Sequence, residues 1–546
     1  MDRIKKLKIK KQDGTFSDYI PISADAENID TTDGESVEIK LNKKPYYYDT
    51  VADMKADTKL KAGDMAVTLG YYSINDGGRA EYKVVSTTSQ NDYQEELNNN
   101  LYATLIVKNN TINIKQLGAN ETAINDTNAL KTFATLNVKT LIIPLGNYKI
   151  NDIVDLTNKE LVGIGEPNIS INGITTSREH TIQIHGTFLI QNIIFNLDVA
   201  RTNILGFYNS HDGIVENCTF NVNNVACNGY FDIYTNNQNI RVVNCNFNCS
   251  SLKEDGETNW AGGIWVREVD NIKETENILF ENCKFYHRSK DEIIACWQTN
   301  GHLHNVQLNN CLLEASPLAT SQHLLRFDCE HSSVNNCIII YKPSDNENRA
   351  SIVNAEDANY EVSFNDCFFD LDLSLSNGIA RGRKITINNS YIVNNKRTQL
   401  GEGCIFKSCK FKLLELQQQV KIFLYNCVFD ISQNTAWVFG AANLIINNCE
   451  FHFSASTQID FILLFGDNGT ISITNTIITI PEDAVSKIRI GNFRSHTAYL
   501  QFVNNIIPSL DVGNSANMSG IIANNIYYNS ITQSSDFTYN NNFNAS

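Results

Sequence analysis

A phrase of alternating apolar residues that ends in Asn-Cys recurs from about residue 185 to the end of this 546-residue chain. Examples are IVENCTF, IRVVNCNF, ILFENCKF and LIINNCEF, and QNIIF near residue 191 is an earlier copy. The cysteine position is occupied in turn by Cys218, Cys245, Cys283, Cys311, Cys337, Cys367, Ser390, Cys409, Cys427, Cys449, Thr476, Asn505 and Asn525. Successive copies are 18 to 38 residues apart, with strand patterning and almost no helix between them. This period predicts the turns of a parallel β-solenoid.

The solenoid also explains the 73 asparagines of the chain. Equivalent positions of successive turns stack about 4.8 Å apart, so an amide can bond its own copy above and below. Asparagine also tolerates the left-handed backbone of a tight bend. We therefore expect the Asn of each Asn-Cys pair to form a turn ladder, with Asn217, Asn244 and Asn282 as neighbours. Nine of the 14 cysteines then point inward as one file of small apolar groups. A metal-binding or redox file is the alternative, although Ser390 and Thr476 occupy the same file.

Composition excludes several other classes of protein. With 42% hydrophobic and 19% charged residues, the chain folds, and it is long enough for several cores. Its net charge of −16 disfavours nucleic acid as a partner. No apolar run reaches the ~18 residues of a membrane-spanning helix, so we expect no membrane insertion. Six basic residues by residue 11 precede no apolar segment, which predicts no secretion signal and folding in a reducing cytoplasm. We expect no cofactor and no metal.

The first 140 residues have a different character from the repeats. Residues 4–11 and FSDYIPI read as a small hairpin, and ESVEIKLNKK as a short helix. A helix over DTVADMKAD, with Asp49 or Thr50 as N-cap, precedes strands MAVTLGYYS and AEYKVVS, which a turn at NDGG joins. LYATLIV and TINIKQLG add two strands, and INDTNALKTFATL is a helix capped by Asp126 or Thr127.

These residues and the repeat together resemble the pectate-lyase-like, right-handed parallel β-helix superfamily. The resemblance rests on QLGANETAINDTNALKTF, KTLIIPLGNYKI and LVGIGE. The segment DYIPISADAENIDTTDG, followed by KPYYYDTVADMKADTKLKAGDMAVTLGYYSINDGGRAEY, is similar to the N-terminal part of tail-fibre and tailspike proteins from phages and prophages of Gram-positive bacteria. The fold class expected is mainly β, with a parallel β-helix and a small N-terminal α/β adaptor domain. The expected divisions are a virion-attachment segment (1–45), the adaptor domain (46–118), a capping-helix region (119–140) and the β-helix (141–546).

Each turn is expected to contain one more strand, which precedes the strand that leads into the asparagine ladder. A candidate site lies where several of these preceding strands carry charged residues. When these strands are aligned, carboxylates, guanidinium groups and two Trp fall on neighbouring turns. The aligned segments are IWVREV, IIACWQT, LLRFDCE, SIVNAED and IARGR. The predicted catalytic carboxylates are Glu268, Asp328, Glu330 and Glu356, and the predicted substrate-binding residues are Trp265, Arg267, Trp297, Arg326, Asp357 and Arg381. Glycoside hydrolysis needs two carboxyl groups about 5 Å or about 6.5 to 9.5 Å apart. Neighbouring and next-neighbouring turns offer about 4.8 and 9.6 Å. An outward ladder of charges that only solubilises the face is the alternative.

The resemblance implies a phage tail appendage, a tailspike or receptor-binding protein, that recognises a bacterial surface polysaccharide such as capsule or teichoic acid. It further implies a homotrimer, an N-terminal contact with another tail or baseplate protein, and a place in the virion after assembly in the host cytoplasm. Two functions stay open at this point. Either the charged face depolymerises the polysaccharide, as a glycoside hydrolase or a polysaccharide lyase, or the protein is a non-enzymatic binding or structural appendage.

Overall fold

The computed structural model describes the greater part of the chain, with gaps concentrated between the strands of the repeats. The described residues are 6–7, 20–21, 45–120, 125–172, 179–197, 202–223, 229–249, 263–270, 272–288, 292–298, 302–316, 323–342, 351–355, 360–372, 379–382, 384–398, 400–416, 422–432, 437–439, 443–454, 459–465, 470–481, 486–492, 498–507, 510–512, 518–527, 531–532 and 537–544. The chain divides into two compact units, one made of residues 1–120 and 128–141 and the other of residues 121–127 and 142–546. No helix of the described ranges is long and apolar enough to cross a membrane.

The first unit contains a small mixed α/β fold. Its central sheet has the order β3-β4-β5-β7-β6. The elements that precede the repeats are β1 (Lys6–Leu7), β2 (Ile20–Pro21), β3 (Tyr46–Tyr48), α2 (Val51–Ala56), β4 (Met65–Thr68), β5 (Ala80–Val85), β6 (Gln94–Glu96), β7 (Tyr102–Leu105), β8 (Thr111–Asn113), η2 (Ile114–Leu117), α3 (Thr127–Thr135) and β9 (Thr140–Pro144).

Most local predictions for these residues are confirmed. Strands β1 and β2 pair antiparallel, as do β4 and β5. Helix α2 begins after Thr50, whose hydroxyl accepts from the backbone N–H of Asp53 while the Asp53 carboxylate accepts from the N–H of Thr50. The second half of TINIKQLG is a 3-10 helix and not a strand, because Asn113 caps it and Gly118 ends it in the left-handed conformation. The helix predicted over ESVEIKLNKK lies outside the described residues.

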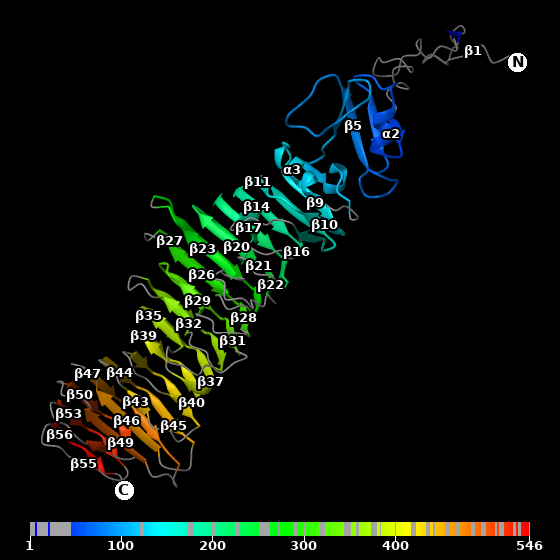
Figure 1. Cartoon of the computed structure of the whole chain (residues 1–546). Helices are drawn as coiled ribbons and strands as arrows, with labels where there is room; N and C mark the ends of the chain where they lie inside the picture. The colour runs from blue at the N-terminus through cyan, green and yellow to red at the C-terminus, as the bar shows by residue number, and fades with distance from the viewer. Residues whose placement is uncertain are drawn as a thin grey trace, which may run out of the picture. The chain divides into compact units, whose positions relative to one another are not determined.

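The second unit is a right-handed parallel β-helix, as the repeat predicts. Sheet A consists of β10 (Asn147–Ile150), β13 (Asn168–Ile171), β16 (Ile194–Leu197), β19 (Thr219–Val222), β22 (Asn246–Cys249), β25 (Lys284–His287), β28 (Leu312–Ala315), β31 (Ile338–Tyr341), β34 (Phe368–Leu371), β37 (Tyr391–Thr398), β40 (Lys410–Leu416), β42 (Val428–Ile431), β45 (Glu450–Phe453), β48 (Ile477–Thr479), β51 (Ile506–Ile507), β54 (Ile526–Tyr527) and β57 (Phe543–Asn544). Figure 1 shows these strands stacked turn upon turn within the unit.

Two further faces complete each turn. Sheet B consists of β11 (Val154–Thr157), β14 (Glu179–Gly186), β17 (Thr202–Ser210), β20 (Gly229–Thr235), β23 (Gly263–Glu268), β26 (Ile294–Gln298), β29 (His323–Phe327), β32 (Ser351–Ala355), β35 (Ala380–Gly382) and β38 (Gly401–Glu402). Sheet C includes β12 (Glu160–Ile164), β15 (Leu189–Gln191), β18 (Ile214–Glu216), β21 (Gln238–Val243), β24 (Thr275–Glu281), β27 (Leu303–Asn309), β30 (Ser332–Asn335), β33 (Val362–Asn365), β36 (Ile385–Asn388), β39 (Cys404–Lys407), β41 (Ile422–Tyr425), β44 (Asn443–Asn447), β47 (Thr470–Thr474), β50 (Ala498–Val503), β53 (Met518–Ala523) and β56 (Phe537–Asn540). A separate sheet D, made of β43 (Trp437–Phe439), β46 (Ile459–Phe465), β49 (Ser486–Asn492), β52 (Leu510–Val512) and β55 (Ile531–Thr532), belongs to the C-terminal turns.

The asparagine ladder lies at the bend between sheets C and A. Asn217, Asn244 and Asn282 have φ values of 53°, 54° and 54°, which place them in the left-handed region. The Nδ2 of Asn244 donates to Oδ1 of Asn217 at 3.3 Å, and the pair Asn336 and Asn310 repeats this bond at 2.6 Å. Asparagine at this bend therefore fulfils both expected roles. It adopts a positive φ, and its amide forms hydrogen bonds with the equivalent asparagine of the neighbouring turn.

The cysteine file lies directly behind this ladder, inside the β-helix. The nine repeat cysteines are all buried and free. Their thiols donate to backbone carbonyls, as Cys283 does to Val242 and Glu281, both at 3.4 Å. Burial raises the pKa of the Cys367 thiol to about 12, so the neutral thiol predominates at neutral pH. These contacts fit small buried groups better than reactive or ligating thiolates.

Candidate functional site

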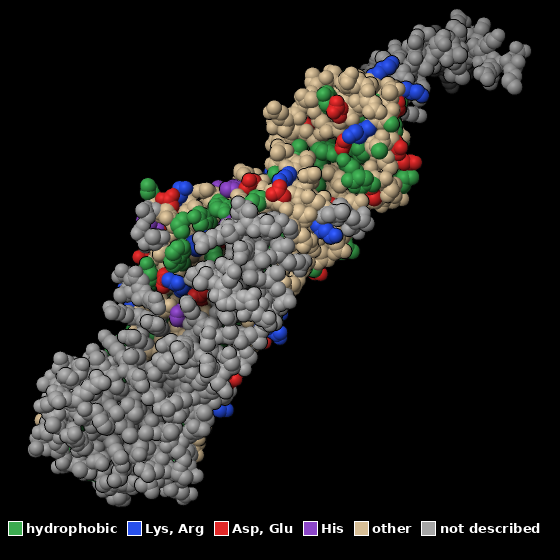
Figure 2. Space-filling view, in the orientation of Figure 1, with side chains coloured by type: hydrophobic (Ala, Val, Ile, Leu, Met, Phe, Trp, Pro, Cys, Tyr) green, Lys and Arg blue, Asp and Glu red, His purple; other side chains and the backbone are tan. Residues whose placement is uncertain are grey.

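Sheet B presents its outward side chains in register across successive turns. Strand β20 pairs with β23 so that Asp232 lies opposite Trp265, and β26 pairs with β29 so that Ala295 lies opposite Arg326. Strand β23 in turn places Arg267 opposite Trp297. Figure 2 shows hydrophobic, basic, acidic and His side chains next to one another over the region where Figure 1 places β14 to β29. The strands predicted to align from the sequence do align, and this face is the candidate site.

An aromatic and cationic surface forms around Arg267. Its guanidinium carbon lies 4.8 Å from the ring centroid of Tyr234 and 4.8 Å from that of Trp265. Trp297 follows on the next strand with 39% of its surface exposed. Three residues predicted to bind substrate, Trp265, Arg267 and Trp297, are thus brought together, and Tyr234 joins them.

A buried carboxylate that the sequence did not single out anchors this surface. Asp232 is fully buried and accepts a hydrogen bond from Nε of Arg267 at 2.9 Å, together with a second, short one from Nη2. Its Oδ2 also lies 2.9 Å from Nε2 of His180, whose Nδ1 forms a short hydrogen bond with the hydroxyl of Tyr208. Burial alone would raise the pKa of Asp232, but the His180 hydrogen bond and the Arg267 charge outweigh it and lower that pKa. Asp232 is therefore an anion that fixes Arg267.

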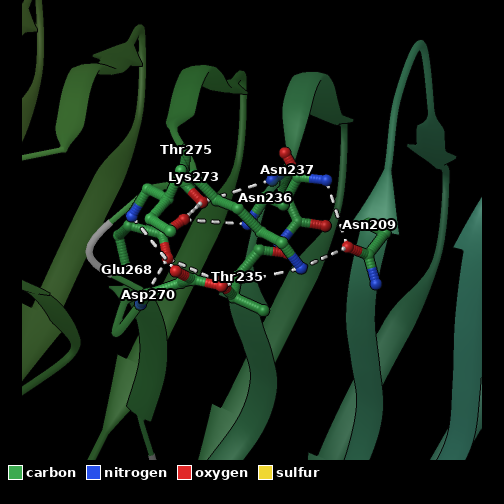
Figure 3. Close-up of polar contacts among 9 residues, drawn as sticks. Asn209, Thr235, Asn236, Asn237, Glu268, Asp270, Lys273 and Thr275 are labelled. Atoms are coloured by element: carbon green, nitrogen blue, oxygen red, sulfur yellow. Dashed lines mark hydrogen bonds and ion pairs between the residues drawn. The ribbon is translucent and has the colours of Figure 1, made fainter.

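Glu268, a predicted catalytic residue, ends strand β23 and is not part of this surface. Its side chain is buried with 1% exposure. The carboxylate accepts hydrogen bonds from the backbone N–H groups of Asn236 and Asp270, both at 2.8 Å, and from the hydroxyls of Thr235 and Thr275. Figure 3 shows these contacts converging on it. The register of β23 and β26 places Glu268 opposite Gln298, and Arg267 opposite Trp297. Because neighbouring residues of a strand point to opposite faces, Glu268 does not share the face of Arg267 and Trp297.

We expect Glu268→Gln to lower the free energy of unfolding by about 1.5 to 3 kcal/mol. The substitution removes the charge of a carboxylate that accepts four hydrogen bonds. It also replaces one acceptor oxygen by an NH₂ group, which then faces donors where an acceptor is needed. Urea unfolding of both proteins measures the difference. Glu314→Gln on β28, whose side chain lies on the outer face of sheet A, is the matched control and should change stability by less than about 0.5 kcal/mol. An equal effect of the two substitutions would contradict the role given to Glu268.

The other predicted carboxylates are paired or lie outside the described residues. Asp328 is buried and accepts from Nε of Arg326 at 2.5 Å. Oε2 of Glu330 lies 3.3 Å from Nδ1 of His304. Glu356 and Asp357 are not among the described residues, and for Arg381 the structure gives the backbone of β35.

A shallow depression opens beside the aromatic surface. Tyr234, Thr235, Val269, Asp270 and Ile272 line it. Thr235 and Asp270 are both held by Glu268, so this buried carboxylate shapes the depression without facing it. Tyr234 belongs to both features, which makes the depression and the surface around Arg267 one continuous site. No group of three or more His, Cys, Asp or Glu side chains with metal-binding geometry occurs in the described ranges.

Comparison with known proteins gives structural neighbours but no sequence relatives. No family model and no curated protein matches the sequence. Among solved structures, the Acinetobacter phage vB_ApiP_P1 tailspike protein is 14% identical with a TM-score of 0.47, over 68% of this chain and 66% of that one. The tailspike gp49 of Acinetobacter baumannii bacteriophage Fri1, described as a capsular polysaccharide depolymerase, is 15% identical with a TM-score of 0.41, over 81% and 75%. Geobacillus virus E2 ORF18 is 13% identical with a TM-score of 0.37, over 68% and 74%. Likeness at this level does not extend to a shared activity.

Proposed function

We propose that this protein is a phage tail appendage, a tailspike or receptor-binding protein, whose sheet B binds a polysaccharide of the bacterial surface. The observation that supports binding most directly is the continuous aromatic and cationic surface of Tyr234, Trp265, Arg267 and Trp297 beside an open depression. Flat rings stack on the apolar faces of sugars, and a fixed guanidinium supplies directed hydrogen bonds. The segment DYIPISADAENIDTTDG and the residues that follow it resemble the N-terminal part of phage tail proteins. This resemblance supports the virion location, with residues 1–45 as the attachment segment and another tail or baseplate protein as its partner.

Binding is tested with fluorescently labelled full-length protein and a panel of Gram-positive strains, including capsule-deficient and teichoic-acid-deficient derivatives. We expect binding to at least one parent strain and its loss in one derivative. Trp297→Ala should weaken binding by about 3- to 10-fold, because ring stacking contributes about 0.5 to 1.5 kcal/mol. Tyr47→Ala, at an exposed ring of the first unit, is the matched control and should bind like the parent. Equal binding by both variants would contradict the site.

We further propose that the protein is a homotrimer in which sheet A contributes to the contact between copies. An outward file on four successive strands is apolar: Leu312, Ile338, Phe368 and Tyr391 lie in register, and Ile338 and Tyr391 are 44% and 37% exposed. Such a file in water favours association, and the equivalent files of three copies can meet around one threefold axis, which closes the assembly. A second copy fits it best, because every copy brings the same stacked apolar file at the same strand spacing.

Light scattering tests this assembly. The expected mass is three times the 61.3 kDa of one chain. Ile338→Glu combined with Tyr391→Glu should shift the mass toward that of one chain, whereas Lys412→Glu, elsewhere on sheet A, should not. A parent protein of 61.3 kDa would refute the trimer.

A second candidate function, cleavage of the bound polysaccharide, is favoured by the hydrogen-bonded chain of Tyr208, His180 and Asp232 beside the same surface.

A further inference from the structure

A chain of three side chains crosses sheet B beside the proposed binding surface. The hydroxyl of Tyr208 on β17 bonds Nδ1 of His180 on β14, and Nε2 of that imidazole lies 2.9 Å from Oδ2 of Asp232 on β20. With an anionic Asp232, Nε2 carries the hydrogen and Nδ1 is the acceptor, so the phenol donates to the imidazole. A hydroxyl, an imidazole and a carboxylate in this order form a path for a proton.

The sequence makes room for this arrangement at one position. The imidazole of His180 passes over Gly206, which lies in register with Asp232 on the neighbouring strand. A Cβ at residue 206 would lie 2.4 Å from Cγ of His180, which is closer than any real contact. The glycine therefore permits His180 to span two strands and reach the carboxylate.

Tyr208 also lies next to the binding surface. Its ring centroid is 5.4 Å from that of Tyr234, which lines the depression, and 5.5 Å from the imidazole of His185, stacked at 20°. Asp232 and His180 are buried, whereas Tyr208 is partly exposed. The phenol is thus the member of the chain placed to meet a bound sugar.

The predicted catalytic carboxylates that the structure describes do not offer the pair that glycoside hydrolysis uses. Glu268 is enclosed by four donors, Asp328 is bonded to Arg326, and Oε2 of Glu330 lies 3.3 Å from Nδ1 of His304. Asp270, which lines the depression, accepts from the backbone N–H of Ile272. β-Elimination from a uronic acid needs instead a proton carrier and a cation near the sugar carboxylate. Tyr208 and Arg267 provide these two groups, since Arg267 uses Nε and Nη2 for Asp232 and has a third nitrogen with two further N–H donors.

We propose that Tyr208, relayed through His180 and Asp232, is the acid–base residue of a lyase site for a polysaccharide containing 4-linked uronic acid. This inference rests on the proposed polysaccharide-binding function and deepens it. Tyr208 passes its phenolic proton to Nδ1 of His180 and takes the proton from C5 of the uronate. The C5–H electron pair becomes the C4=C5 double bond, and the C4–O4 bond breaks with its electron pair on O4. O4 then takes the proton held by Tyr208, whose own proton returns from His180.

The pKa of Tyr208 agrees with this sequence of proton transfers. Burial raises it above the ordinary phenol value, and the Asp232 charge adds to the effect. The resting group is therefore the phenol, which needs the imidazole as acceptor before it can act as a base.

The test uses full-length protein and polysaccharide extracted from a strain that the protein binds. Ultraviolet absorbance of the unsaturated uronate and new reducing ends are followed together. Both should appear with the parent protein, and Tyr208→Phe, which keeps the ring, should lower the rate by at least about 100-fold. Tyr286→Phe, at an exposed tyrosine of sheet A, is the matched control and should retain the parent rate. His180→Gln should lower the rate and flatten its dependence on pH, which a purely structural role would not do.

Each other outcome is decisive. Reducing ends without absorbance mean hydrolysis and overturn the proposal, as does a Tyr208→Phe protein that cleaves at the parent rate. A parent protein that binds cells but cleaves nothing overturns this inference and leaves the proposed binding function intact. A parent protein that binds no strain contradicts the proposed function and this inference with it.

Discussion

Replacing Asp232 by alanine is expected to lower the free energy of unfolding by about 3 to 5 kcal/mol. The carboxylate is fully buried and is bonded to both Arg267 and His180. Removing it leaves a guanidinium with 21% exposure and a buried imidazole beside an empty volume, without the anion that satisfied them. Urea unfolding at neutral pH measures the loss.

The same residue predicts a pH dependence with a definite sign. In the folded protein the pKa of Asp232 lies below the ordinary 3.8. The stabilisation by its carboxylate is therefore fully present above pH 3.8 and is lost as the pH falls through the lowered folded-state pKa. The stability difference between parent and Asp232→Ala should therefore be full at pH 7 and shrink only in strong acid. The double variant Asp232→Ala with Arg267→Met is the control, since it removes the unpaired cation and should recover part of the loss. A single variant within about 1 kcal/mol of the parent would show that the ion pair is not what holds this face.

The fold was predictable because its decisive information is repeated. Most turns place an apolar residue, an asparagine and a small buried residue at the same phase, so a departure at a single position, such as Asp366, Ser390 or Ser408, does not hide the pattern. The structure adds a turn that the pattern missed: Asn525 donates to Asn542 at 3.0 Å, which continues the file past the last recognised copy. That turn was missed because Asn540 and Asn544 occupy strand positions that hold Ala523 and Tyr527 in the preceding copy, so the strand pattern is less apparent there.

The candidate site was only partly predictable, for reasons of register and environment. Aligning the strands located Trp265, Arg267 and Trp297 on one face, because strand alternation is a local rule. Glu268 was assigned to the same face, but it is the last residue of its strand and its carboxylate accepts four hydrogen bonds from the residues that follow and from the neighbouring turn. Such contacts cannot be predicted from the sequence. Asp232 was overlooked because it lies between Phe231 and Ile233, within a segment that reads as an ordinary apolar strand. A lone carboxylate in such a segment, with an Arg one turn later, is the signal that could have revealed it.

Phe429→Ala is expected to destabilise the C-terminal half of the β-helix by about 3 to 5 kcal/mol. Phe429 is fully buried between Phe411 and Phe451, with ring centroids 4.3 and 4.6 Å away and ring planes within 2° and 7° of parallel. Alanine leaves a cavity that the flanking rings cannot fill, because the backbone spacing of the strands holds them a full turn apart.

Two controls separate cavity formation from a general sensitivity to substitution. Phe429→Leu keeps most of the volume and should cost about 1 to 2 kcal/mol, and Phe543→Ala, at a ring that is 62% exposed, should change stability by less than about 0.5 kcal/mol. Hydrogen exchange adds a spatial readout. Each turn is stabilised mainly by its two neighbours, so amides of β40, β42 and β45 should lose protection before those of β13 and β16. Uniform loss of protection over the whole β-helix would instead show that the stack unfolds as one cooperative unit.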